Sequence, residues 1–553
     1  MHYIRLLRPP TVVHAVTAHS RPGQGGFSLG FVLTITTDLG ESFLCPDAPI
    51  DLTVELVVEE DVEMQVDKVD NEVDDDNNES ADGSKKGSEE LHPEKIVKTR
   101  IFKLPLAASS PASAGKAGKA SKPSKATAAA VAAAAAAAAA TSSASQWRAG
   151  MRVLKVEARL SKDAEACLWG SLASTSTTTI SKRRVCICTV DKKLSATHAR
   201  QLVEPKTTVN DHGDGLIMPL WVDVPERPHD AFPHVAVRQL LLQDNVAPEE
   251  GDASRSATWV EVEEEIGESI ARHVWDAGLV AVAYLANTCL APPTTSRKRP
   301  REEEEEEEEK KEADGGSQSF HAKPCSLPDA LRSILVPKHK GQKGQKQIAD
   351  ETLGVLELGS GVGILGIGLA AIVQEASRRG SSSVAVSDRG NAMFLLTDLP
   401  EAEEHARANM ARSGCPSLDY ENLDWEEGRQ GRFGPAVAGH NSRTGSDGSD
   451  GSDGKGWDLV VLSDCTYNVD MLPALVETLT ALSSLKDAQH ARAPPSVLLA
   501  RKPRHASEEA LFPLMADHGW TVRASSTVPL PVLDGEAQIV ELYLYEKKAK
   551  GRT

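Results

Sequence analysis

The chain has 553 residues, more than a single domain of about 100–200 residues needs. Its aromatic fraction is only 4%, and long tracts of charged or small residues cannot bury enough apolar surface to offset the entropy cost of ordering them. The formal net charge of −19 argues against a nucleic-acid partner, because such a surface needs clustered lysine and arginine. We therefore expect a folded core that is interrupted by disordered insertions.

The first residues, MHYIRLLRPPTVVH, contain no apolar run long enough for a signal peptide, and no strongly apolar stretch of about 20 residues follows. Eight cysteines are scattered without a C-x-x-C pair, which favours free thiols in a reducing compartment over a metal site. We expect a soluble, monomeric, cytoplasmic protein with no membrane partner and no metal. The basic cluster at 297–301 is also typical of a nuclear import signal, although a solvated charge run is the commoner explanation.

The first part of the chain, residues 1–262, alternates strand-like segments with low-complexity tracts. Alternating apolar residues predict strands within 27–56, 96–106, 151–160, 185–190 and 216–224. An acidic tract at about 59–94 and a tract rich in alanine and lysine at about 107–145 predict disordered insertions. The sequence thus predicts a β-rich N-terminal region with two insertions.

Apolar residues at helical spacing predict a helix over 263–291, which leads into the next domain and ends before Pro292. A charged, disordered linker is expected at 292–350. From 351 to 548, strands and helices alternate, which predicts an α/β domain with a mostly parallel sheet and an antiparallel pair at its end. The predicted strands are 355–358, 392–397, 418–423, 458–463, 497–500, 521–527 and 539–545, the predicted helices are 364–378, 401–412, 471–485 and 508–518, and a further insertion is expected at 428–456.

A glycine turn follows the first strand of this α/β region. The strand ends in an acid, Glu357, and Gly359, Gly361 and Gly363 then open a helix. Glycines at such a turn allow a ligand to lie against the backbone at the helix N-terminus. The spacing is E-x-G-x-G-x-G, the form seen in S-adenosylmethionine enzymes, whereas a dinucleotide site has G-x-G-x-x-G. The alternative is a purely structural turn.

A second acid, Asp398, follows the strand at 392–397, at the sheet edge where α/β folds bind ligands. A carboxylate there can accept both hydroxyls of a ribose. Asp398 lies further from Gly359 than the usual spacing of about 20 residues, so the rival Asp388 stays open. We prefer Asp398 because a helix starts directly after it, with Pro400 in its first turn.

Two more strand ends carry candidate residues. Asp424 and Trp425 close the next strand, where an indole can cover an adenine and the carboxylate can lie near its amine, although a Trp that packs a loop is as common. Asp464 and Tyr467 follow the strand at 458–463, and both are predicted as catalytic residues that orient an amine and receive its proton. As isolated residues they are equally typical of a helix cap or of core packing.

Together these segments resemble the seven-β-strand protein-lysine methyltransferases, a family that includes the enzyme acting on valosin-containing protein and fungal members labelled as nicotinamide methyltransferases. The resemblance rests on six segments in the family's order: GESIARHVWDAG, VLELGSGVGILGIG, LLTDLPEAEEHARANM, LDWEE, LVVLSDCTYNVDMLPALVETLTAL and RKPRHASEEALFPLMADHGW. It implies a Rossmann-like class I methyltransferase sheet with S-adenosyl-L-methionine as the cofactor. Before residue 263, only LTITTDLGESFL matches the family.

The resemblance also assigns roles to residues. It implies Trp275 and Trp425 beside the cofactor, the three glycines of the turn under its amino-acid portion, and Asp398 on its ribose. The family's D-x-x-Y motif falls on Asp464 to Tyr467 and is associated with the target-lysine channel. The full set of expected cofactor-binding residues is Trp275, Glu357, Gly359, Gly361, Gly363, Asp398, Asp424, Trp425 and Ser463.

Three functions are compatible with the sequence. The first is N-methylation of a lysine on a protein substrate. The second is methylation of a small amine such as nicotinamide. The third is a non-catalytic interaction protein that keeps the methyltransferase fold as a scaffold. A protein substrate predicts an open rim around the site, and a small substrate predicts a lidded pocket.

Overall fold

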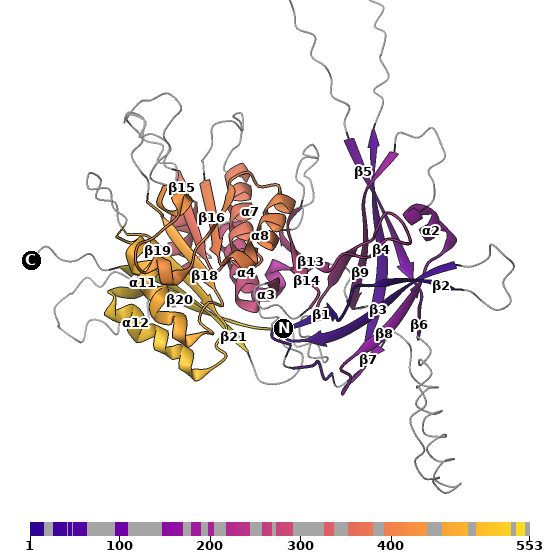
Figure 1. Ribbon diagram of the computed structural model, residues 1–553, viewed down its shortest axis with the longest axis horizontal. Helices are drawn as coiled ribbons and strands as arrows, with labels where there is room; N and C mark the ends of the chain where they lie inside the picture. Colours follow the sequence, from indigo (N-terminus) through magenta and orange to yellow (C-terminus); the bar gives the residue numbers. More distant parts are fainter. Residues whose placement is uncertain are drawn as a thin grey trace, which may run out of the picture.

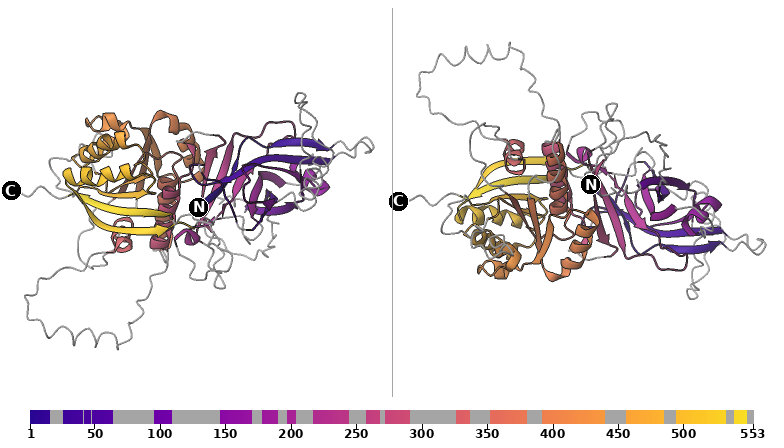
Figure 2. Two further views of the ribbon diagram at one scale, coloured as in Figure 1. Left: turned by 90° about the horizontal axis from the view of Figure 1, so that it is seen from below. Right: turned by 90° about the horizontal axis from the view of Figure 1, so that it is seen from above.

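The computed structural model consists of two lobes that lie side by side along the long axis of the molecule, with the N-terminus where the lobes meet (Figures 1 and 2). The residues that it describes are 1–15, 26–40, 42–46, 48–63, 95–108, 146–169, 178–189, 197–203, 217–243, 257–267, 272–290, 326–336, 352–379, 392–439, 456–484, 494–531 and 538–547. Within these ranges, no helix is long and apolar enough to span a membrane.

The N-terminal lobe is built from two β-sheets that share one core. In β3, Leu29, Phe31 and Leu33 alternate with more exposed residues and are fully buried, and Leu52 and Val54 of β4 face the same core from the other sheet. The first sheet has the order β11-β1-β3-β8-β6, with β2 paired to β3. Its strands are β1 (His2–Leu6), β2 (Thr11–Ala15), β3 (Gly26–Thr36), β6 (Leu106–Ala108), β8 (Leu154–Arg159) and β11 (Ile217–Met218).

The second sheet of this lobe has the order β10-β13-β12-β9-β4-β5, with β14 paired to β13 and β7 paired to β4. Its strands are β4 (Ile50–Glu63), β5 (Lys95–Leu104), β7 (Gln146–Trp147), β9 (Thr178–Thr189), β10 (Thr197–His198), β12 (Leu220–Asp223), β13 (Val235–Gln243) and β14 (Thr258–Glu265). Two short helices, α2 (Lys162–Trp169) and α3 (Ala199–Val203), accompany these strands. The sheet is larger than the sequence predicts, because β7 and β10 are only two residues long, β13 has no predicted counterpart, and β14 overlaps the start of a predicted helix.

The helix predicted at 263–291 is wrong at its beginning. Residues 258–265 form the strand β14, in which Val260 and Val262 are buried and alternate with glutamates. The helix α4 (Asp276–Leu290) begins only at Asp276. The predicted helix thus includes the last three residues of β14, because the apolar series that predicts it begins at Ile266, directly after this strand.

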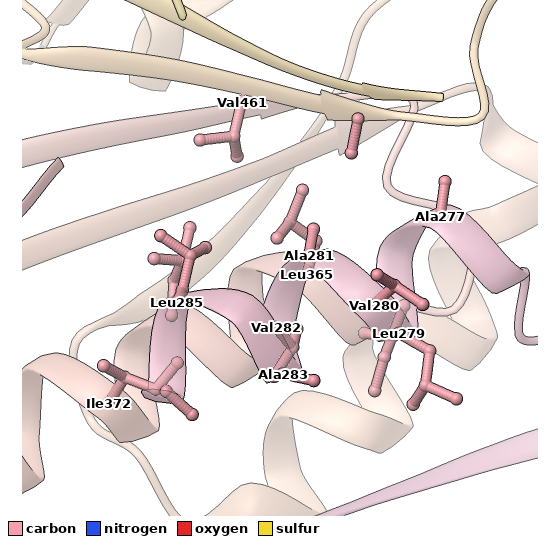
Figure 3. Close-up of a cluster of buried hydrophobic side chains, with 14 of the residues drawn as sticks. Ala277, Leu279, Val280, Ala281, Val282, Ala283, Leu285, Leu365, Ile372 and Val461 are labelled. Carbon is pink, nitrogen blue, oxygen red and sulfur yellow. The ribbon is translucent and has the colours of Figure 1, made fainter. Parts of the chain in front are cut away.

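Helix α4 is apolar on all sides and lies at the centre of the C-terminal lobe. Twelve of its 15 residues are buried. Figure 3 shows its side chains between the sheet, represented by Val461 of β18 (Leu459–Ser463), and helix α7 (Ile364–Arg379), represented by Leu365 and Ile372. A helix without a polar face is stable only when it is enclosed in this way.

The C-terminal lobe contains a seven-stranded sheet with the order β17-β16-β15-β18-β19-β21-β20. The pairs from β17 to β19 are parallel, and β21 is antiparallel to both β19 and β20. The remaining strands are β15 (Leu353–Leu358), β16 (Ala392–Asp398), β17 (Leu418–Asn422), β19 (Ser496–Arg501), β20 (Trp520–Pro529) and β21 (Ile539–Lys547). The prediction of an α/β fold with a final antiparallel pair is confirmed.

Helices cover both faces of this sheet. Val355, Val461 and Leu498 face α4 and α7, whereas Leu356 and Val460 face the opposite layer. The other helices are α6 (Leu327–Leu335), α8 (Pro400–Ser413), α9 (Trp425–Gly428), α10 (Pro435–Gly439), α11 (Leu472–Leu482) and α12 (Leu511–Asp517), with the 3-10 turns η3 (Val469–Met471) and η4 (Ala506–Ala510). Burial on both faces explains the almost continuous apolar sequences of these strands.

Several predicted disordered segments contain regular structure. Strand β4 extends to Glu63, and β6 occupies 106–108, so the first residues of both predicted insertions of the N-terminal region belong to strands. Helix α6 lies within the predicted linker, α9 ends at the first residue of the predicted insertion at 428–456, and α10 lies within that insertion. The rest of these insertions, the basic cluster at 297–301 and Asp388 lie outside the described residues.

Candidate functional site

The candidate site lies where the strand order of the sheet reverses, between β15 and its neighbour β18. From β15 the chain proceeds outward to β16 and β17, and then returns to β18 and proceeds the other way to β19. Ligands of open α/β sheets bind at such a switch point, beyond the carboxyl ends of the strands. The glycine turn follows β15, and Asp464 follows β18, so both predicted motifs meet at this point.

The three glycines of the turn adopt positive φ angles, 66° at Gly359, 53° at Gly361 and 85° at Gly363. A Cβ atom on Gly359 would lie 2.6 Å from the Sγ of Cys465 and 3.3 Å from the Trp425 ring. Glycine at 359 is therefore required by its backbone conformation and by packing within the protein, in addition to any ligand. The close approach brings the turn against residues that follow β17 and β18 in the chain.

Two buried polar atoms beside the turn have no hydrogen-bond partner among the residues that the structure describes. Glu357 accepts a hydrogen bond from the Gly366 N–H at 2.9 Å through Oε2, but its Oε1 has none, and neither does the buried Ser360 Oγ. Burial raises the pKa of Glu357 to about 8, and the hydrogen bond from the Gly366 N–H partly offsets this shift. Buried polar atoms are normally paired, so these two atoms fit a ligand that brings hydrogen-bonding groups.

Asp398 lies at the end of β16 and faces the turn. Its Oδ2 accepts a hydrogen bond from the Gly361 N–H at 2.7 Å, and its Oδ1 accepts one from the Leu399 N–H at 2.7 Å. Burial raises the pKa of Asp398, and these two N–H groups oppose the shift. Each oxygen keeps a lone pair, as a contact with two ribose hydroxyls requires.

Asp424 and Trp425 begin α9 beyond β17. The Asp424 side chain is the helix N-cap and accepts a hydrogen bond from the Glu426 N–H at 2.8 Å. The Trp425 ring packs on Gly359, and its carbonyl accepts a hydrogen bond from Thr478 Oγ1. Trp425 therefore packs against the glycine turn, while the Asp424 side chain caps α9.

Asp464 is the only non-glycine residue with a positive φ, 51°, among the residues that the structure describes. Its Oδ2 accepts a hydrogen bond from the Ala277 N–H at 2.9 Å, and its Oδ1 accepts one from the Lys502 N–H at 3.3 Å. Burial raises the pKa of Asp464 to about 6, and the charge of Arg504 opposes the shift. A strained backbone of this kind persists only where the surroundings hold it, and it is common at functional sites.

Tyr467, at the other end of the D-x-x-Y motif, is exposed to 59%. Partial burial raises the pKa of its phenol, and Cys465 and Asp398 add to the shift. The Tyr467 side chain is thus largely exposed, whereas the Asp464 side chain is 8% exposed. The structure describes no hydrogen bond between the two, and their predicted catalytic roles remain predictions.

Trp275 and Ser463 lie at the N-terminal end of α4. The Arg504 guanidinium stacks over the Trp275 ring at 5.4 Å from its centroid. Ser463 Oγ lies 3.1 Å from where a Cβ on Gly278 would be, so the end of β18 packs closely on α4. Both residues border Asp464 and its neighbours rather than the glycine turn itself.

A buried ionic cluster beneath Asp464 was not predicted from the sequence. Lys502 donates hydrogen bonds to Asp38 at 2.9 Å and to Asp276 at 2.7 Å, and Arg504 donates to Asp38 at 2.8 Å. The Tyr3 hydroxyl donates to Asp276 at 2.6 Å. Of these residues, Tyr3 and Asp38 belong to the N-terminal lobe and the other three to the C-terminal lobe. The only sequence signal was the segment LTITTDLGESFL, which contains Asp38.

Comparison with known proteins supports an assignment of the C-terminal lobe. The model of the lysine methyltransferase family matches residues 254–313, 330–434 and 445–518, which together make up less than half of the chain. This part of the chain is similar to lysine methyltransferases. The match includes the glycine turn, Asp398 and Asp464, and it supports a methyltransferase that uses S-adenosylmethionine. No curated protein matches the chain.

Similar solved structures include an O-methyltransferase family protein from Burkholderia thailandensis, with 12% identity over 36% of this chain and 52% of that one and a TM-score of 0.23. The mitomycin 7-O-methyltransferase MmcR shares 14% identity over 36% and 49%, with a TM-score of 0.22. An O-methyltransferase family 2 protein from Planctomyces limnophilus, in complex with apigenin, shares 14% over 39% and 56%, with a TM-score of 0.22. This chain thus spans about half the length of each, and similarity this distant says nothing of the substrate.

Proposed function

We propose that this protein is a methyltransferase that transfers the methyl group of S-adenosylmethionine to a lysine side chain of another protein. The observation that carries the proposal is the glycine turn at the switch point of the sheet, with Asp398 of the neighbouring strand hydrogen-bonded to it at 2.7 Å. The match to the lysine methyltransferase family covers the same residues and supports the choice of a lysine.

The residues around the turn fit the cofactor. Glu357 Oε1 and Ser360 Oγ would form hydrogen bonds with polar groups of the cofactor. Asp398 would bind its ribose, and the Trp425 ring would cover its adenine. When bound, S-adenosylmethionine supplies a sulfonium-activated methyl group. Trp275 and Ser463 border the same end of the sheet and complete the proposed binding set.

The protein has to bring an uncharged amine in line with this methyl group and exclude water from both. We assign Tyr467 to the substrate side, because its exposed phenol oxygen can accept a hydrogen bond from the lysine ammonium group, which has to release a proton to water before its nitrogen attacks the methyl group. The Asp464 carboxylate accepts hydrogen bonds from the Ala277 and Lys502 N–H groups and lies 3.4 Å from the Arg504 guanidinium. We therefore assign Asp464 the role of fixing the strand end from which Tyr467 projects.

The exposure of Tyr467 favours a protein substrate over a small amine, since a rim residue that is 59% exposed is typical of an open site. We expect a lysine-bearing protein of the cytoplasm or the nucleus as the partner, and a monomeric enzyme. A small amine such as nicotinamide stays the alternative within the same chemistry, and a scaffold without activity is the alternative outside it.

Two measurements separate these functions. Calorimetry of the full chain with S-adenosylmethionine and with S-adenosylhomocysteine tests the site itself, and no heat with either ligand would favour the scaffold. Incubation of the protein with a cell lysate and S-adenosylmethionine labelled on its methyl group tests the substrate. A labelled protein band that disappears with the Asp398→Asn variant supports lysine methylation, whereas label found only in small molecules would favour the amine.

A further inference from the structure

The buried ionic cluster joins the two lobes directly beneath the candidate site. Asp38 follows β3 of the N-terminal lobe, and Lys502 and Arg504 follow β19 of the C-terminal lobe. The Asp38 side chain is 1% exposed, Lys502 is 7% exposed and Arg504 is 14% exposed. Charges so far from water are tolerated only when each has an opposite partner, so the loss of one carboxylate leaves two cations poorly paired.

The electrostatics of Asp38 agree with this arrangement. Burial alone would favour the neutral acid, but hydrogen bonds and charges from Arg504 and Lys502 outweigh burial and hold the pKa of Asp38 well below its usual range. The same two cations also contact acids of their own lobe, Asp276 and Asp464. Among the described residues, Asp38 is therefore the one acid that the N-terminal lobe contributes to this cluster, and Tyr3 of the same lobe is its neutral neighbour on Asp276.

The cluster continues from Asp38 into the site. Arg504 lies 3.4 Å from Asp464 Oδ1 and stacks on Trp275, and the Lys502 N–H donates to the same Asp464 oxygen. Cys465, the next residue, packs on Gly359 of the glycine turn. Two contacts thus connect the N-terminal lobe with the glycine turn. Asp38 forms an ion pair with Arg504, and Arg504 contacts the end of β18, which packs on the turn.

We propose that Asp38 is a positioning residue for the methyl-transfer site, so that the N-terminal lobe completes the site instead of being an independent appendage. This inference rests on the proposed function. In this role Asp38 orients Arg504 and Lys502, and these fix the strained backbone at Asp464 and the Trp275 ring. Another interlobe ion pair, Arg412 with Glu263, joins α8 to β14 and contacts none of these residues, so it provides a matched control.

The test is calorimetry of the full-length protein and its variants with S-adenosylhomocysteine, at a temperature where each variant is folded. We expect Asp38→Asn to weaken binding about tenfold. Asp38→Glu keeps the carboxylate and should bind more tightly than Asp38→Asn, whereas the affinity of Glu263→Gln should stay within about twofold of the wild type. Arg504→Lys should weaken binding to a similar extent, and the Asp38→Asn/Arg504→Lys double variant should be no weaker than either single one, because the two residues act through one contact.

Wild-type affinity in Asp38→Asn, or an equal loss in Glu263→Gln, would overturn the inference and leave Asp38 as a link between lobes only. Should Asp38→Asn fail to melt cooperatively, Arg504→Lys decides, since unchanged binding in that variant equally overturns the inference. If the wild type itself binds neither S-adenosylmethionine nor its product, the proposed function fails, and the inference fails with it.

Discussion

Asp398→Asn is the sharpest test of the proposed cofactor site. The substitution keeps the size of the side chain but replaces one carboxylate oxygen, and the charge, with an amide nitrogen. Both oxygens accept a backbone N–H at 2.7 Å, from Gly361 and Leu399, and the amide nitrogen cannot accept either. The variant therefore loses one anchor of the glycine turn and the two-oxygen contact with the ribose.

A hydrogen bond to a charged group contributes about 1.5–3 kcal/mol. Loss of one such bond to the cofactor weakens binding about 10- to 150-fold, at ~1.4 kcal/mol for each factor of ten. Calorimetry with S-adenosylhomocysteine at neutral pH measures the change, and Asp419→Asn, the same change on an exposed side chain of β17, is the control. Affinity within about twofold of the wild type would refute the assignment and transfer the ribose role to Asp388.

Three further variants test other parts of the site. Gly359→Ala should lower the free energy of unfolding, measured in urea, by about 2–5 kcal/mol, because residue 359 has a φ of 66° and the added methyl group would lie 2.6 Å from Cys465 Sγ. Adding Cys465→Ala should recover only the part of this loss that is due to packing, and full recovery would contradict the argument from the backbone conformation. Tyr467→Phe should lower turnover of labelled cofactor more than its affinity, whereas equal losses would indicate a structural role. Burial raises the pKa of Glu357 from 4.5 to about 8, so ionisation of this acid opposes folding. The neutral Glu357 side chain stabilises the fold fully below about pH 4.5. This stabilisation, on the order of a few kcal/mol, is lost as the pH rises to about 8. Glu357→Gln should therefore lose less stability than the wild type between pH 5 and pH 8, and parallel pH profiles would show that Glu357 does not titrate in that interval.

The order of elements in the C-terminal lobe could be predicted because its strands are buried on both faces and therefore apolar, and because turn residues separate its helices from them. The motif Glu357 to Gly363 and the strand end at Asp398 both fall where the sequence predicts them. Helix α6 also carried its own signal, since Ser326 caps it and Pro328 lies in its first turn, but the surrounding charged tract concealed it.

The contacts of Asp38 could not be predicted, because 464 residues separate it from Lys502 and an acid two residues before a glycine is typical of a turn. The prediction missed strand β14 for a different reason. Glu264 is 3% exposed there, where an acid is rare, and its partner Arg238 lies on the neighbouring strand β13. Alternation of valine with glutamate on a half-polar strand is a weak pattern beside the long apolar helix that follows.

Strand β14 has a practical consequence for any attempt to produce the catalytic part alone. The family match begins at residue 254, immediately before β14, but β14 pairs with β13 of the N-terminal lobe. A truncation at that boundary would expose the whole hydrogen-bonding edge of β14, together with the apolar side of α4 that packs on α3 and β13. Unpaired edges next to apolar surface promote aggregation. Expression of the two lobes as one chain therefore avoids an insoluble fragment that a division by sequence family would produce.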